Sequence, residues 1–240
     1  MKRNFSSTLI LLSAFLLFNS ASAQKKERET IEGNGKLVTR DVSVQPFNSL
    51  KASGVYELKL SQGNTETVKI EADENLQEYF TVKNEGTTLV IDMKKMENKN
   101  FNAKNKLRVY VTFKKLNDIE LHTVGNVVAE DHLTFDNLEL SNNSVGNINL
   151  KMSANKIDLE NNGVGNITLT GKAQNAVFKN SGVGSLKAGD FVVQTMNIEN
   201  IGVGSAEVNA EKELKVEDSF LGKVKNKGSA PLKKKNKVVI

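Results

Sequence analysis

Apolar residues recur through the second half of the chain in a unit that repeats about every 19 residues, as in a solenoid-type repeat. Each unit has two apolar residues two positions apart, then an Asn- and Gly-rich stretch, then another apolar residue. The first apolar column comprises Ile119, Leu138, Ile157, Ala176, Met196 and Leu214, at nearly constant steps. The glycine column comprises Gly125, Gly146, Gly165, Gly184, Gly204 and Gly222. A spacing of two is typical of a strand with one buried face.

A unit of this length holds two or three short strands and cannot bury its own apolar face. Units stacked in parallel would bury a continuous column of Ile, Leu and Val. The pattern therefore predicts an all-β fold, a single-stranded parallel β-helix or solenoid with about 19 residues per coil in the C-terminal half. The general preference of parallel crossover connections favours a right-handed coil.

The Gly-Val-Gly sequence, present in three of the six units, predicts a sharp corner, because Gly and Asn tolerate positive φ. We expect its valine, such as Val164, to point into the core. A phosphate-binding loop would need a single strand-to-helix junction, whereas here the motif recurs and a strand follows it. Calcium-binding solenoids carry Asp after such a turn, but this chain has Asn126, Asn147, Asn166, Ser185, Ser205 and Lys223. We expect a hydrogen-bonded Asn/Ser column there, not a metal site.

The segment Met1–Ala23 has the features of a secretory signal peptide. Lys2 and Arg3 precede the apolar run Leu9–Phe18, and Ala21-Ser22-Ala23 matches a cleavage site. The run is too short to span a bilayer, so we expect an exported protein without a transmembrane segment. We place it in the periplasm or on the outer surface of a Gram-negative-type cell. The chain has no cysteine, which excludes a cysteine-anchored lipoprotein and thiolate metal ligands.

The rest of the chain divides into four parts by composition. We predict a flexible linker over residues 24–35 and a β-rich part over 36–115, in which "SLKASGVYELKL" carries a Gly-Val corner of its own. That corner is consistent with irregular solenoid coils. The regular repeats cover residues 116–228, and a Lys-rich end covers 229–240. Residues 94–106 resemble an exposed loop, and residues 74–79 a single helical turn.

Composition narrows the classes of function. The formal net charge is +5, and no Trp is present. A nucleic-acid binder would show a basic face with aromatic or Arg readers, so no nucleic acid is expected as a partner. The two histidines, His122 and His132, are too few for a metal site without a third ligand. No nucleophile elbow with a Ser–His–Asp pattern occurs, so we expect no catalytic residue, cofactor or metal.

Two groups of charged residues form the candidate binding face. The first is an acidic column of Glu120, Glu139 and Asp158, which the repeat alignment places on successive coils about 5 Å apart. Such a column could hold a cation or serve an acid–base reaction, although charged outward positions are also the default on a half-buried strand. The second group comprises Lys223, Lys225, Lys233, Lys234 and Lys235. These lysines could attract an anionic surface or guard the edge of the last coil against aggregation.

The chain also resembles a known family. The patterns "F..L..SGVYELKLSQG....V.I.AD" and "L.VYVTF..L..IEL...GNV", followed by glycine-rich β repeats, are similar to the head domain of autotransporter adhesins, the head GIN domain. The resemblance covers about residues 40–228. It implies a secreted β-solenoid with an adhesin-like role, and it supplies no catalytic residues.

The function expected from these observations is that of an exported, non-enzymatic β-solenoid with an adhesin-like or envelope-binding role. The expected partners are an envelope glycan, lipopolysaccharide or another surface protein. Two alternatives stay open at this point. One is a glycan-active enzyme on a β-helix scaffold, and the other is a periplasmic accessory protein that binds lipid or envelope components.

Overall fold

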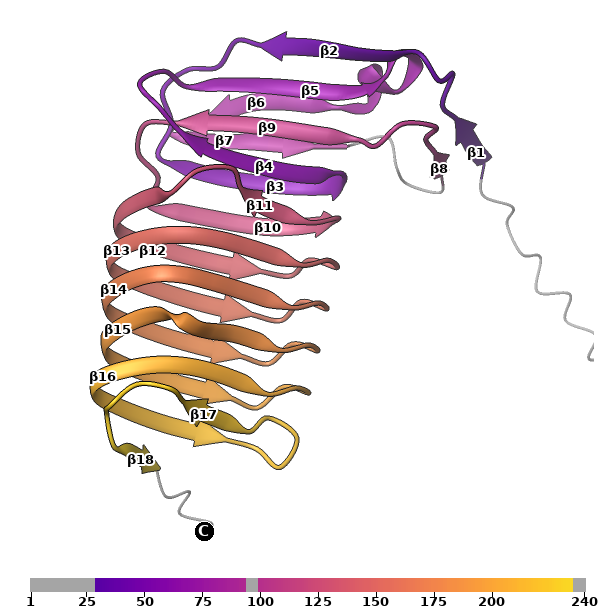
Figure 1. Cartoon of the computed structure of the whole chain (residues 1–240). Coiled ribbons are helices and arrows are strands. Elements are labelled where there is room, and N and C mark those ends of the chain that lie inside the picture. The colour runs from indigo at the N-terminus through magenta and orange to yellow at the C-terminus, as the bar shows by residue number, and fades with distance from the viewer. Residues whose placement is uncertain (1–28, 94–98, 235–240) are drawn as a thin grey trace, which may run out of the picture.

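The computed structural model describes residues 29–93 and 99–234. The predicted signal peptide, residues 94–98 and Lys235 lie outside the described residues. Within the described residues the chain forms a β-solenoid with a strand-rich N-terminal end (Figure 1). The N-terminal strands are β1 (Glu29–Glu32), β2 (Leu37–Val42), β3 (Ser49–Val55), β4 (Glu57–Gln62), β5 (Thr67–Asp73), β6 (Thr81–Glu85), β7 (Thr88–Asp92), β8 (Lys99–Asn102) and β9 (Arg108–Phe113). The predicted helical turn is η1 (Glu74–Tyr79), a short 3-10 helix.

The repeats form the regular coils. Their strands are β10 (Asp118–Val124), β11 (Val127–Ala129), β12 (Leu133–Asn142), β13 (Ile148–Asn161), β14 (Ile167–Asn180), β15 (Leu186–Asn200), β16 (Ala206–Asp218), β17 (Val224–Asn226) and β18 (Leu232–Lys234). Successive strands pair in parallel at the predicted repeat step, so that Leu138 pairs with Ile157 and Ile157 with Ala176. The predicted parallel solenoid is therefore confirmed.

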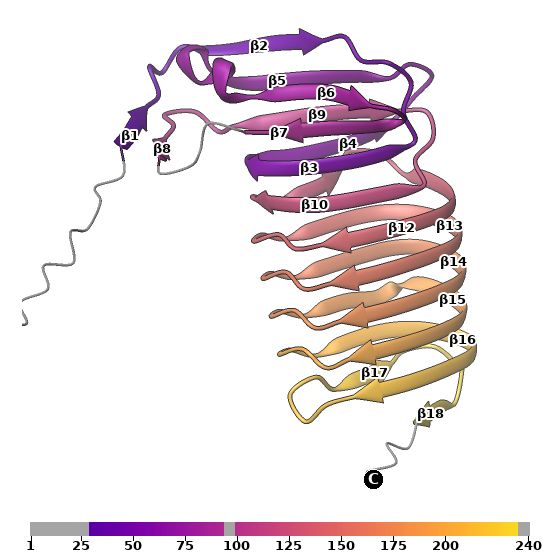
Figure 2. The ribbon, with the colours of Figure 1, turned by 180° about the vertical axis from the view of Figure 1, so that it is seen from behind.

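Each coil contributes to two facing sheets. In β13 the alternation of buried and exposed residues breaks at Asn155 and Lys156, which are both exposed, so the strand bends there and changes sheet. We call the sheet that contains residues 148–154 the front sheet and the sheet that contains residues 157–161 the back sheet. In Figure 1 the strands nearer the viewer run from the corner edge to the opposite edge, and the strands behind them run back to the corner edge. The chain moves down the solenoid as it makes these turns. This sense of winding makes the coil right-handed (Figures 1 and 2).

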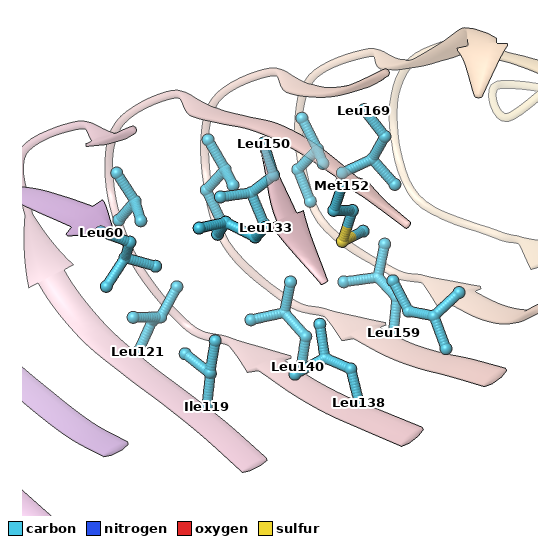
Figure 3. Close-up of a cluster of buried hydrophobic side chains, with 14 of the residues drawn as sticks. Leu60, Ile119, Leu121, Leu133, Leu138, Leu140, Leu150, Met152, Leu159 and Leu169 are labelled. Carbon is cyan, nitrogen blue, oxygen red and sulfur yellow. The ribbon is translucent and has the colours of Figure 1, made fainter. Parts of the chain in front are cut away.

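The core lies between the two sheets and runs without interruption along the coils. The stacked column Val127, Ile148, Ile167, Leu186 and Ala206 is buried throughout. Leucines of the back sheet, among them Leu140 and Leu159, face these side chains across the core, and Met152 of the front sheet packs among them (Figure 3). Burial of these side chains supplies the stability that a cysteine-free chain cannot draw from disulfides.

The N-terminal end extends both sheets beyond the regular coils. In the back sheet, β10 pairs with β3, β3 pairs with β7, and β7 pairs antiparallel with β6. In the front sheet, β11 pairs with β4, β4 pairs with β9, and β5 and β2 follow in antiparallel order. The short strands β1 and β8 pair only with each other. Residues 99–102 of the expected loop are therefore a strand.

The repeat register predicted for the first coil is wrong by two positions. Ile119 pairs with Leu140, not with Leu138, and Glu120 pairs with Ser141, not with Glu139. Five positions separate Ile119 from Val124, whereas seven separate Leu138 from Val145. The corners stack Val124 on Val145, so the shorter first unit must shift its strand by two positions.

The corner valines do not point into the core, contrary to the prediction. Val124, Val145, Val164, Val183 and Val203 stack as an exposed row, with Val164 49% exposed. The interior of the corner instead holds a ladder of asparagines. Asn142 donates its side-chain amide to Asn161, Asn161 to Asn180, and Asn180 to Asn200, at 2.6, 2.6 and 2.5 Å. Each of these buried polar side chains therefore has a hydrogen-bond partner in a neighbouring coil.

The second glycine of each corner is required by close approach between coils. Gly165 has φ +136°, and a Cβ on it would lie 2.1 Å from the carbonyl oxygen of Gly146. Gly184 repeats the contact, with φ +134° and 2.1 Å to the Gly165 carbonyl oxygen. Only glycine combines this backbone conformation with so short an approach. The Gly-Val-Gly repeat therefore serves the stacking of the coils.

Candidate functional site

The outer face of the back sheet carries the three carboxylates predicted for binding, together with Lys233. It has two adjoining shallow hollows of about 410 and about 260 Å³. The first lies over Glu139, Ser141, Lys156, Asp158 and Glu160, the second over Asn197, Glu199, Lys215 and Glu217, and both reach Val177 and Lys179. Because outward and inward residues alternate along each strand, these side chains project from a buried apolar layer.

One column on this face changes from acidic to basic along the solenoid axis. From the N-terminal end it comprises Asp118, Glu139, Asp158, Val177, Asn197, Lys215 and Lys233. We call it the graded column. Its seven positions extend over roughly 29 Å at the spacing of neighbouring strands. The column therefore presents negative charge at one end and positive charge at the other.

The acidic end of the graded column begins at Asp118, which the sequence analysis missed. Partial burial, followed by the carboxylates of Glu139 and Glu120, raises the pKa of Asp118. Asp158 forms an ion pair with Lys156 at 2.7 Å, while its other carboxylate oxygen is buried without a hydrogen-bond partner. Asp118 could have been found from the two-position difference in length between the first unit and the next.

Glu120 lies beside the graded column, in the next outward row. Both of its carboxylate oxygens accept hydrogen bonds from Lys51, at 2.9 and 3.0 Å, and His122 lies 2.6 Å from one of them. The hydrogen bond from Lys51 and the one from His122 lower the pKa of Glu120. Glu120 is thus held in a local ion-pair cluster at the N-terminal edge of the face.

The predicted lysines are divided between different sides of the last coils. Lys233 extends the graded column, and Lys234 is the last residue of β18. Lys225 projects from the front sheet, where it lies 3.7 Å from Glu207. Lys223 follows the last corner. The structure therefore brings Lys233 onto one face with Glu139 and Asp158, and it places Lys225 on the opposite sheet.

The Asn/Ser column beside the corners is hydrogen-bonded as expected. The side-chain oxygens of Asn126, Asn147 and Asn166 each accept a bond from the backbone N–H one coil further on, at 3.0, 3.0 and 2.9 Å. His132 lies 2.8 Å from the Ser153 hydroxyl. Across residues 29–93 and 99–234 no group of three or more His, Cys, Asp or Glu side chains could hold a metal ion.

An exposed apolar edge is a second feature that the sequence analysis missed. The corner valines form a ridge along the solenoid, and Ile201, Phe220 and Leu221 continue it at the C-terminal end. Phe220 is 87% exposed and Leu221 60% exposed. The change from Gly-Val-Gly to Phe-Leu-Gly in the last unit was visible in the sequence, but the direction of the side chains was not.

Comparison with known proteins gives the family. Residues 46–230 match the family described as "Putative auto-transporter adhesin, head GIN domain". The chain belongs to this family. No curated protein matches the chain.

Solved structures share the fold. A "putative adhesin" from Bacteroides fragilis NCTC 9343 is 27% identical, with a TM-score of 0.71, over 85% of this chain and 100% of its own. A "putative lipid binding protein" from Parabacteroides distasonis ATCC 8503 is 18% identical, with a TM-score of 0.60, over 87% of this chain and 100% of its own. A "putative adhesin" from the same organism is 20% identical, with a TM-score of 0.56, over 86% and 100%. The similarity to the last two structures shows a shared fold and nothing more.

No helix in the described part of the chain has the length and apolar character needed to cross a membrane.

Proposed function

We propose that this protein is an exported, adhesin-like binding protein that holds an extended, charged polymer of the cell envelope on the outer face of its back sheet. The observation that carries the proposal is the graded column, which orders acidic and basic groups along one rigid line. A polymer with both anionic and cationic groups, such as an envelope glycan, would meet opposite charges at the two ends of this line.

The form of the face supports binding more than catalysis. Its hollows are shallow and adjoin one another, so the face offers an elongated surface in place of a deep cleft. Asp158 is paired with Lys156 and Glu120 with Lys51, so both carboxylates are held in ion pairs on the face. Many weak contacts along one polymer add up through multivalency.

A glycan-cleaving activity remains the second candidate because of one observation. Asp118, whose pKa is raised, is the direct neighbour of Glu139 on the next coil. A carboxyl group with a raised pKa next to a carboxylate is the arrangement that glycoside hydrolysis uses. The same binding experiment should therefore also measure the release of reducing sugar ends.

The experiment is a binding screen of the chain from Gln24 against charged envelope glycans, with affinities from titration calorimetry. We expect Asp158→Asn and Lys215→Gln each to weaken binding about five- to tenfold, since each removes one charge contact, and we expect salt to weaken it further. Lys187→Gln, an exposed change on the front sheet, is the matched control. Equal losses in all three variants, or no binding to any glycan, would contradict the proposal.

A further inference from the structure

The last corner of the solenoid differs from the others in chemistry. Where the three preceding coils have Gly-Val-Gly, this one has Phe220-Leu221-Gly222. The carbonyl of Leu221 accepts a hydrogen bond from Gly204 N–H at 3.1 Å, so Leu221 continues the valine ridge. The loop between β16 and β17 protrudes at the C-terminal end of the ridge (Figures 1 and 2). Phe220 and Leu221 thus stand at the tip of the ridge.

Exposed Phe and Leu side chains in adjacent positions are unusual on a protein surface. Phe220 is 87% exposed, and it is the most exposed of the large hydrophobic residues in the described part of the chain. Its exposure leaves most of an aromatic ring in water, which favours transfer into an apolar environment. The neighbouring Ser219 anchors the loop, because its hydroxyl accepts a hydrogen bond from Gly222 N–H at 3.0 Å. The tip is therefore held in place and not folded onto the core.

The surroundings of the tip are basic. No Asp or Glu occurs after Asp218 in the sequence. Lys223 follows the tip directly, and Lys225 is 79% exposed on the next strand. Within the described residues Lys223 forms no ion pair, and the contact of Lys225 with Glu207 is loose at 3.7 Å. The positive charge at this end is thus available to a partner.

We propose that this C-terminal end docks on an anionic lipid surface, with Phe220 and Leu221 inserted among the lipids and the lysines against the head-group phosphates. Aromatic and aliphatic side chains at the interface combined with lysines are the two contributions that interfacial membrane binding needs. A soluble polyanion would use the lysines and leave the apolar tip without a role. Docking by this end would leave the graded column free along the side of the solenoid.

The test is co-sedimentation of the chain from Gln24 with vesicles of phosphatidylcholine alone or mixed with phosphatidylglycerol. We expect binding to the mixed vesicles only, with a fall at high salt. The double variant Phe220→Ser/Leu221→Ser should weaken binding at least tenfold. The double variant Lys223→Gln/Lys225→Gln should weaken it about 25-fold, since each of the two lysines near an anionic surface contributes about a fivefold factor. Lys151→Gln/Lys187→Gln on the front sheet is the charge-matched control.

All of these positions are exposed, so thermal melting should show every variant folded. Absence of binding to the mixed vesicles would overturn the proposal. So would an equal loss in the control variant, which would indicate diffuse charge attraction. The soluble polyanion heparin provides a further comparison. If heparin binds as tightly as the vesicles do, and the Phe220→Ser/Leu221→Ser variant binds it equally well, the site would be assigned to polyanions instead. Because the glycan titration uses Asp158 and Lys215, failure of one proposal is distinguishable from failure of the other.

Discussion

Replacing one corner glycine should destabilise the solenoid far more than replacing the valine beside it. In Gly165→Ala the new Cβ would lie 2.1 Å from the Gly146 carbonyl oxygen, at a φ of +136°. Holding a non-glycine residue in such a backbone region costs about 1–3 kcal/mol. To relieve this contact, the corner must also move away from the neighbouring coils. That movement strains two backbone hydrogen bonds, from Gly146 N–H to the Val164 carbonyl and from Gly165 N–H to the Val183 carbonyl, which are both 2.8 Å long.

Two weakened backbone hydrogen bonds add about 1 kcal/mol each, so we expect a loss of about 3–5 kcal/mol in the free energy of unfolding. Urea denaturation followed by circular dichroism measures this loss. Hydrogen exchange would locate it, because stability in repeat proteins is largely a sum of neighbouring terms. Val164→Thr, at a position that is 49% exposed, is the matched control and should cost less than about 1 kcal/mol. A loss below about 1 kcal/mol for Gly165→Ala would refute the stacking argument.

Two further substitutions test the buried polar groups. Asn161→Ala should cost about 2–4 kcal/mol in urea unfolding, because it leaves the amide of Asn142 and the oxygen of Asn180 unpaired in the interior; a cost near zero would show that the ladder is not stabilising. Asp73→Asn should cost about 2 kcal/mol at neutral pH. Burial of the Asp73 carboxyl raises its pKa, but hydrogen bonds from Asn105, Lys104 and Gly35 outweigh burial and lower it. The lowered pKa stabilises the fold above the unfolded value of about 3.9, so the gap between wild type and variant should narrow as pH falls below about 4. A gap independent of pH would contradict this role.

The exposed valine ridge explains why a repeat can look like core in the sequence and lie on the surface in the fold. Val164 has a β-branched side chain that suits a strand-like stack. The interior position at the corner is taken by Asn161, whose amide can bridge two coils at 2.6 Å. A valine there would leave the backbone N–H of Gly163 without the oxygen that now accepts it at 3.2 Å. The need of buried polar groups for hydrogen-bond partners therefore decides which side of the corner is buried.

The sequence by itself determined the architecture of the regular coils. Apolar positions two apart in each unit and a near-constant repeat step are local and periodic features, and a chain with them has few ways to bury its apolar side chains except by stacking. The first apolar column, from Leu138 to Leu214, pairs and is buried as predicted for this reason. The Asn/Ser column at the corners followed from the same periodicity.

Only the tertiary structure decided the register of the first coil, the direction of the corner side chains and the composition of the binding face. A shift of two positions preserves the inward and outward alternation, so periodicity alone did not reveal that Asp118, and not Glu120, stacks on Glu139. Likewise, the distribution of lysines over two sheets depends on where β17 and β18 pair with β16. These are pairings between distant segments, and their geometry is settled when the coils close on one another.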